Sequence, residues 1–243
     1  MDLDQDEKLF LKMLQDYTKK SRELYSDFYD RDWINGVLNR YVGNNTYPLV
    51  GGYDYAQRVM LCVTPYDEPY DIPICILKIE VSTGIGKDLT HRDFLGSLLA
   101  LGIERTKIGD IIVSPSGAYV IVRRSISEFI RWNLTQVGRY SKLNITEAEH
   151  VEVEPPKYKK ITGTVASVRA DAVFSLAFGI SRTTCSALLK QGKGKCSGMV
   201  ITGTYHLDVG EVASLQGFGK FRLKEVSGVT RKNRLSITLE KFI

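Results

Sequence analysis

The chain has 243 residues, of which 43% are hydrophobic and 25% are charged. These proportions are typical of a folded globular chain and exclude a wholly disordered, collagenous or fibrous protein. The formal net charge of +5 is unevenly distributed, because residues 1–73 carry −5, residues 74–154 are neutral and residues 155–243 carry +10.

The basic C-terminal third indicates a polyanionic partner, because clustered Lys and Arg side chains release counterions condensed on phosphates. A basic surface that serves only solubility is the alternative, and charge alone does not decide between them.

No apolar run reaches the roughly 18 residues of a membrane-spanning helix. The start of the chain is acidic, unlike a secretory signal, and the four cysteines contain no CxxC pair. We therefore expect reduced thiols in a cytoplasmic protein with no membrane partner.

Residues 1–73 are predicted to form a mixed region of helices and strands. Apolar side chains from Leu9 to Tyr17 recur at spacings of three and four, which predicts a helix. A shorter helix is predicted from Trp33 to Tyr41. After a turn at Gly51-Gly52, a strand is predicted from Arg58 to Val63.

Residues 74–154 follow a β-α-β-β-α-β pattern. Strands are predicted at 74–81, 107–113 and 118–122, and a last strand at 150–153. The first helix has the capping-box residues Thr90 and Asp93 at its start and Gly102 after its end, and Ser125 is the expected N-cap of the second. This order predicts an α+β fold, a ferredoxin-like (RRM-like) domain.

Pro155-Pro156 and the basic residues after it predict a stiff spacer before a C-terminal domain, residues 155–243. A strand at 160–165 is followed by a helix at 171–178 and a second helix with Ser181 as its N-cap. Short strands then lead to a closing pair at 221–226 and 235–239.

This C-terminal region resembles the S4 RNA-binding domain. The match is carried by Arg169-Ala-Asp171, Ile180-Ser-Arg182, Leu189-Lys-Gln-Gly192, Lys195-Cys-Ser-Gly198 and Val209-Gly-Glu-Val212. The resemblance implies an αL-type fold whose two helices and following hairpin present a basic face to structured RNA. One departure is Ser197, where the family usually has Asn, the residue that better accepts a positive φ before Gly.

The resemblance implies RNA contacts at Arg169, Ser181, Arg182, Lys190, Lys193 and Lys195. Lys220, in a segment where related chains carry more arginine, is added to this set. Because Arg182 and Lys190 are eight residues apart on one helix, both can point to the same side. Lys193 and Lys195 alternate on an extended segment and so share a face.

Three stretches in the rest of the chain resemble the YlmH family of bacterial S4-domain proteins. They are Gly51-Gly-Tyr-Asp-Tyr-Ala-Gln-Arg58, Leu89-Thr-His-Arg-Asp-Phe-Leu-Gly96 and Leu101-Gly-Ile-Glu-Arg-Thr-Lys-Ile-Gly-Asp-Ile111. The resemblance covers essentially the whole chain. It implies a factor that binds RNA of the large ribosomal subunit, or peptidyl-tRNA, in ribosome-associated quality control. Family members are thought to hold peptidyl-tRNA on an obstructed large subunit while a tail is added to the stalled chain.

The middle domain is a candidate second RNA surface. Its sheet lacks the aromatic-rich RNP1 pattern, and Tyr119 is the only aromatic on its expected strands. Basic residues near a helix start favour anions, so His91 and Arg92 are candidates, together with the loop residues Arg105 and Lys107. The alternative is that Thr90 and Asp93 simply cap the helix, with His91 and Arg92 exposed.

The sequence gives little support for a catalytic site, a cofactor, a metal ion or a small-molecule substrate. Gly84-Ile-Gly-Lys87 lacks the spacing of a Walker loop, and the three histidines lack ligand spacing. Arg169-Ala-Asp171 resembles the Arg-Leu-Asp of pseudouridine synthases but lies inside the S4 match. We therefore expect a non-enzymatic RNA-binding protein. A pseudouridine-synthase-like RNA-modifying enzyme and an interaction adaptor in cell division are the alternatives.

Overall fold

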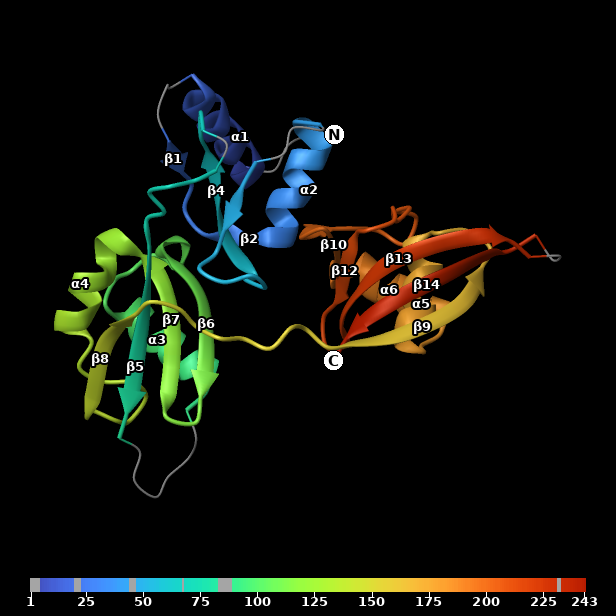
Figure 1. The fold of residues 1–243 in the computed structure, drawn as a ribbon. Coiled ribbons are helices and arrows are strands. Elements are labelled where there is room, and N and C mark those ends of the chain that lie inside the picture. The colour runs from blue at the N-terminus through green and yellow to red at the C-terminus, as the bar shows by residue number, and fades with distance from the viewer. Residues whose placement is uncertain (1–4, 20–22, 44–46, 67, 83–88, 231–232) are drawn as a thin grey trace. The chain divides into compact units, whose positions relative to one another are not determined.

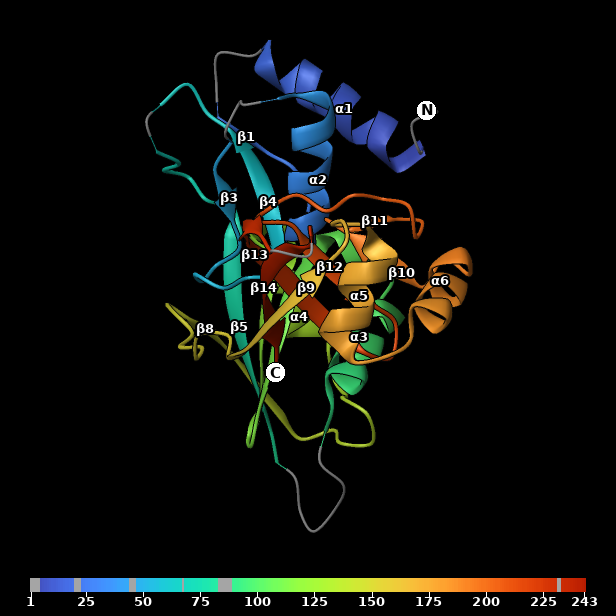
Figure 2. The same ribbon diagram turned by 90° about the vertical axis from the view of Figure 1, so that its right-hand side faces the viewer.

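The computed structural model describes residues 5–19, 23–43, 47–66, 68–82, 89–230 and 233–243. The chain divides into two compact units, one of residues 1–31 and 44–153 and one of residues 32–43 and 154–243 (Figure 1; Figure 2). The stretch 84–87, considered above as a nucleotide loop, lies outside the described residues.

The N-terminal part of the first unit combines a helix with a small antiparallel sheet. Its elements are α1 (Gln5–Thr18), β1 (Leu24–Tyr25), β2 (Tyr29–Asp30), β3 (Leu49–Val50) and β4 (Arg58–Val63). The strands β1, β2 and β3 all pair with β4. The predicted helix at 9–17 and the predicted strand at 58–63 are confirmed.

The rest of the first unit is the predicted β-α-β-β-α-β arrangement. It contains β5 (Ile74–Val81), α3 (His91–Ala100), a 3-10 turn η1 (Arg105–Lys107), β6 (Ile108–Ser114), β7 (Gly117–Arg123), α4 (Arg124–Asn133) and β8 (Leu143–Ala148). The sheet order is β6-β7-β5-β8, and all neighbours are antiparallel. This is the ferredoxin-like topology.

Two details of the prediction for this domain are wrong. Arg123, not Ser125, is the N-cap of α4, so Ser125 lies inside the first turn. The last strand is at 143–148, where Ile145 lies opposite Ile79 of β5. Residues 150–153 also alternate between apolar and polar, but they form no strand and continue into the segment before Pro155.

Both faces of this sheet are covered within the first unit. On one face, Phe94 and Leu98 of α3 and Ile130 of α4 pack in a buried cluster with β5 and β7 residues. On the other, Ile76 and Ile121 pack with residues of the N-terminal part, namely Tyr25, Phe28, Met60 and Cys62. Tyr119 also packs against this second cluster. The face that an RRM-like domain would offer to RNA is therefore occupied by the protein's own N-terminal part.

The second unit contains most of α2 (Arg31–Tyr41) and all of the C-terminal elements. These are β9 (Tyr158–Val165), α5 (Ala170–Phe178), α6 (Arg182–Lys190), β10 (Gly194–Cys196), β11 (Met199–Val200), β12 (Val212–Leu215), β13 (Gly219–Val229) and β14 (Leu235–Phe242). The sheet order is β11-β10-β12-β13-β14-β9. The α+β class is confirmed, as are the predicted helices. The assignment of this unit to the S4 fold stays a prediction.

The helices α5 and α6 cover one face of this sheet (Figure 1). Phe174 of α5 and Phe221 of β13 are fully buried and meet edge to face, with ring centroids 5.1 Å apart. Gly179, at a φ of 66°, makes the turn between the helices. Among the described residues no single helix is long and apolar enough to cross a membrane; α5 and α6 pass that test only as a pair bent by 116°.

Candidate nucleic-acid interface

Asp171 joins two of the predicted RNA-contacting residues. Arg182 Nη2 lies 2.7 Å from Asp171 Oδ2, and Arg169 Nε lies 3.3 Å from Oδ1. The Asp171 side chain is only 9% exposed, whereas that of Arg182 is 56% exposed. The carboxylate therefore fixes one edge of the Arg182 guanidinium and leaves much of the group open to solvent.

The electrostatics of Asp171 favour this arrangement. Burial by itself raises the pKa of the carboxyl group, but hydrogen bonds from Arg182 and Arg169 outweigh it and hold the pKa below its usual value. Asp171 is thus ionised at neutral pH, and the cluster of one carboxylate and two guanidinium groups keeps one net positive charge.

Lys190, Lys193 and Lys195 follow on the C-terminal side of this cluster and are exposed. Among the described residues none of the three forms an ion pair. Gly192, at a φ of 72°, ends the turn after α6 and directs the chain into β10. Three exposed cationic side chains that form no ion pair within the described part of the chain suit contact with phosphate groups.

Lys193, Lys195 and Lys220 line one surface pocket, which we call the lysine pocket. Lys195 lies opposite Ser214 of β12, and Ser214 lies opposite Lys220 of β13, so neighbouring strands bring these residues together. The rest of the lining is formed by Ser214, Leu215, Gln216 and the glycines Gly192, Gly217 and Gly219. Lys220 also lies 3.6 Å from Asp32 of α2. Sequence reasoning missed Ser214 and Gln216, although the alternation in 212–215 predicts a strand.

Ser181 serves first as the N-cap of α6. Its Oγ accepts a hydrogen bond from the backbone N–H of Thr184 at 3.0 Å and lies 2.8 Å from the Thr184 hydroxyl oxygen. The predicted cap is therefore confirmed.

In the first unit, His91 and Arg92 are exposed in the first turn of α3. The Asp93 carboxylate accepts hydrogen bonds from the N–H and the hydroxyl group of Thr90, each at 2.7 Å. The capping role is thus filled by Thr90 and Asp93, and the two basic side chains stay available to an anion.

Arg105 and Lys107 are bound within the first unit. Arg105 donates to the carbonyl oxygens of Ile108 and Gly109, and burial, with the nearby Arg58 charge, lowers its pKa to about 10. Lys107 Nζ lies 2.7 Å from Asp27, which also accepts from Arg123 at 3.0 Å. Arg105 and Lys107 therefore make contacts within the first unit, whereas His91 and Arg92 are exposed to solvent.

Two of the three signature stretches meet in one polar network. The Asp110 carboxylate accepts from the Tyr53 hydroxyl at 2.9 Å and from the Gln57 N–H at 2.6 Å. The Arg58 guanidinium donates to the carbonyl oxygens of Phe28, Arg105 and Ile108. The stretches at 51–58 and 101–111 therefore hold the N-terminal part to β6.

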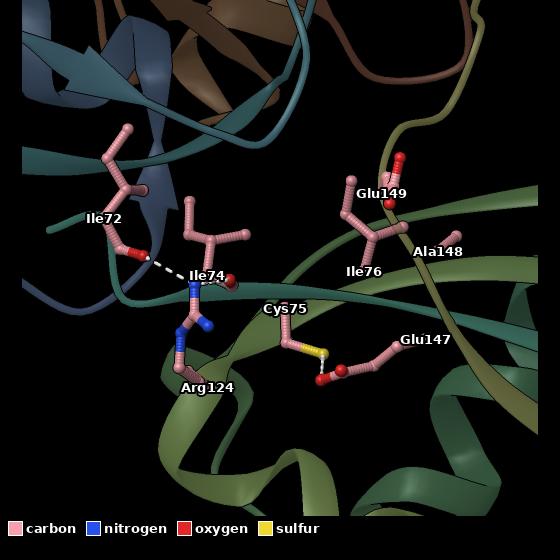
Figure 3. Close-up of a pocket in the computed structure, with 8 residues that line it drawn as sticks. All are labelled: Ile72, Ile74, Cys75, Ile76, Arg124, Glu147, Ala148 and Glu149. Atoms are coloured by element: carbon pink, nitrogen blue, oxygen red, sulfur yellow. Dashed lines mark hydrogen bonds between the residues drawn. The ribbon is translucent and has the colours of Figure 1, made fainter. Parts of the chain in front are cut away.

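A second pocket lies in the first unit, beside Cys75 and Glu147 (Figure 3). Cys75 Sγ donates to Glu147 Oε1 at 2.8 Å, and Arg124 donates to the carbonyl oxygens of Ile72 and Ile74. Burial, reinforced by the Glu147 carboxylate, raises the pKa of Cys75 to about 12. The thiol is thus protonated at neutral pH and is a poor nucleophile. The described residues contain no group of three side chains that could hold a metal ion.

Comparison with known proteins finds a family model, a curated protein and a solved structure that are similar to this chain. Residues 65–152, which include β5 to β8, match the family described as "Putative RNA-binding domain in YlmH". The chain is 27% identical over 248 residues to the ribosome-associated protein quality control protein P2 of Bacillus subtilis (strain 168), covering 97% of this chain and 95% of that protein. The solved structure of the cell division protein ylmH from Streptococcus pneumoniae is 21% identical, with a TM-score of 0.47, covering 61% of this chain and 94% of that one. The chain is therefore similar over nearly its whole length to the Bacillus subtilis protein, and residues 65–152 match the RNA-binding domain that the YlmH family model describes, in agreement with the resemblance seen in the sequence.

Proposed function

We propose that the protein binds RNA of the large ribosomal subunit, together with peptidyl-tRNA, and acts in the quality control of stalled nascent chains in the cytoplasm. The observation that carries the proposal is the meeting of Lys193, Lys195 and Lys220 in the lysine pocket. The name of the Bacillus subtilis relative and the description of the family model support it.

The chemistry of this surface suits the backbone of a structured RNA. Lysine ammonium groups are compact point charges that contact phosphate oxygens without reading a base. The exposed part of the Arg182 guanidinium adds planar N–H donors beside them. Such a surface predicts affinity and salt sensitivity rather than recognition of a sequence.

The proposal is for binding rather than for catalysis. Asp171 is the carboxylate that a pseudouridine-synthase-like site would use. It is largely buried and is held by two guanidinium groups. Its role in this structure is to position Arg169 and Arg182.

The test is sedimentation of the full chain with purified ribosomal subunits. We expect the protein to migrate with the large subunit, and the combined variant Lys190→Glu, Lys193→Glu, Lys195→Glu to lose this migration. Arg182 is left in place, because a carboxylate there would face Asp171 and disturb folding. The matched control is Lys8→Glu, Lys12→Glu, Lys142→Glu, which changes the net charge equally at exposed lysines of the first unit.

Loss of migration in the first variant, and not in the control, supports the proposal. Equal migration of both variants at physiological salt would show that this surface is not the RNA contact. If the wild type binds free structured RNA but not the large subunit, the ribosomal part of the proposal is wrong.

A further inference from the structure

The six-stranded sheet of the second unit has a second face, opposite α5 and α6, which the proposed function uses only at Lys195 and Lys220. Strand alternation identifies its members, because Ile161, Leu223 and Leu239 point into the core. Their neighbours Lys160, Arg222 and Glu240 therefore point the other way, and they lie opposite one another on β9, β13 and β14. We call this surface the outer sheet face.

Two aromatic rings and an arginine lie together on the outer sheet face. Tyr158 and Phe242 lie opposite each other on β9 and β14, with ring centroids 4.9 Å apart and planes at 69°. The Arg222 guanidinium carbon is 5.9 Å from the Tyr158 ring and 6.0 Å from the Phe242 ring. Tyr158 is nevertheless 39% exposed, so part of its ring is open to solvent at the edge of the sheet.

Basic side chains predominate around these rings. Lys160, Lys195, Lys220, Arg222 and Lys224 lie on this face or at its bulge. Carboxylates lie among them too: Glu240 is 3.7 Å from Arg222 and 3.3 Å from Lys224, Asp32 of α2 is 3.6 Å from Lys220, and the exposed Glu225 lies opposite Thr238. Lys195 and Lys220 are two strands apart, which places their backbones about 10 Å from each other. Thr162 and Thr238, paired across β9 and β14, add hydroxyl groups to the same face.

Exposed rings between cationic side chains are the features of a single-stranded nucleic-acid surface, where bases stack on aromatics and phosphates follow the charges. We infer that the outer sheet face binds a single-stranded RNA segment, with phosphates at Lys160, Lys220 and Arg222 and a base stacked on Tyr158. An acidic protein would also match the positive charge of this face, but its carboxylates would gain little from the exposed Tyr158 ring. The inference rests on the proposed RNA-binding function and adds a second surface to it.

The charge part of the inference is tested with the full chain and a short fluorescent oligouridylate. Lys160→Ala is compared with Lys159→Ala, because the two lysines are adjacent, exposed and on opposite sides of β9. We expect Lys160→Ala to reduce the slope of log affinity against log salt by roughly 0.7, the value of one phosphate contact on a single strand. Lys159→Ala is expected to leave both the slope and the affinity unchanged.

The stacking part has a different signature. Tyr158→Ala should weaken oligouridylate binding by roughly five- to a hundredfold without changing the salt slope, because stacking releases no counterions. Tyr158→Phe keeps the ring and should bind as the wild type does. The midpoint temperature of unfolding, measured for each variant, identifies any loss of binding that comes from a loss of fold.

The outcomes separate this inference from the proposed function. If Lys160→Ala and Tyr158→Ala bind oligouridylate as the wild type does, while the triple Glu variant still loses the large subunit, the inference is overturned and the proposed function stands. If polyglutamate displaces oligouridylate equally well and Tyr158→Ala has no effect, the face is a site for acidic protein and the inference is again overturned. A wild type that binds no RNA of either kind overturns both.

Discussion

At the scale of single residues, Asp171 determines how two arginines are presented. It is the only carboxylate that the described structure places against both Arg169 and Arg182. Its burial makes the interaction costly to lose, because removing one partner leaves buried charge without compensation.

The first prediction follows from this position. Asp171→Asn should destabilise the second unit by about 1–3 kcal/mol at pH 7, since hydrogen bonds between charged groups are lost. The folded pKa of Asp171 is depressed, so its contribution is complete above the unfolded pKa near 4 and is lost as the pH falls through the lower folded value. Urea unfolding at pH 7 and at pH 3 measures both effects.

Asp208→Asn, at an exposed carboxylate of the same unit, is the control for this measurement. We expect it to leave the unfolding midpoint unchanged at either pH. If Asp171→Asn also leaves the midpoint at pH 7 unchanged, Asp171 does not hold the two arginines as described.

Arg58 gives the second prediction. Its guanidinium donates to three carbonyl oxygens from two segments of the first unit, one at Phe28 and the other at Arg105 and Ile108. An ammonium group cannot reproduce this planar set of donors, so Arg58→Lys should cost about 1–3 kcal/mol of stability. RNA affinity per folded molecule should not change. Thermal unfolding and oligonucleotide binding measure the two quantities.

Arg92→Lys, at an exposed arginine of the same unit, is the matched control for stability. An equal midpoint temperature for Arg58→Lys and Arg92→Lys would contradict the structural role that we give to the stretch at 51–58.

At the scale of elements, the sequence predicts the helices and long strands well because their apolar spacing is regular. The predictions are wrong where more than one residue or segment fits the same sequence pattern. Ser125 has the chemistry of an N-cap, but Arg123 holds that position. Residues 150–153 alternate as 143–148 do, and only pairing with β5 distinguishes them. The lysine pocket was only partly predictable, because the approach of Lys220 to Lys195 depends on the register of β12 between them.

The turn between β10 and β11 gives an element-scale prediction. Ser197 and Gly198 have φ of 47° and 73°, so the sequence departure at Ser197 still gives the expected hairpin turn. A Cβ atom at Gly198 would lie 2.5 Å from the Cα atom of Trp33 in α2. Gly198→Ala therefore combines backbone strain with a clash against an adjacent helix, and the clash should cost roughly 1–3 kcal/mol beyond the strain.

Gly210→Ala separates these two costs. Gly210 also has a positive φ, at 95°, but a Cβ atom there would meet nothing within 4 Å. Thermal unfolding should show a clearly larger decrease for Gly198→Ala than for Gly210→Ala. Equal decreases would mean that α2 does not lie against this turn.

At the scale of the whole molecule, the acidic N-terminal part and the basic C-terminal part have different tasks. The N-terminal part covers the sheet face of the middle domain with Tyr25, Phe28 and Met60. We therefore expect any RNA contact of the first unit to lie elsewhere, and the exposed Arg92 and His91 at the start of α3 are the candidates. Composition could not reveal this, because the covering residues are apolar and far away in sequence.

The last prediction concerns the number of RNA contacts that the two units make together. Two weak sites on one chain gain affinity through effective concentration, so loss of a contact in the first unit should weaken large-subunit binding more than binding of a short RNA. Arg92→Ala should therefore reduce the affinity for large subunits and decrease its salt slope by roughly 0.7–0.9. Lys142→Ala, at another exposed cation of that unit, should change neither. Titration at several salt concentrations measures the slope. An unchanged slope in Arg92→Ala would show that Arg92 contacts no phosphate, because the loss of a phosphate contact also removes its counterion release.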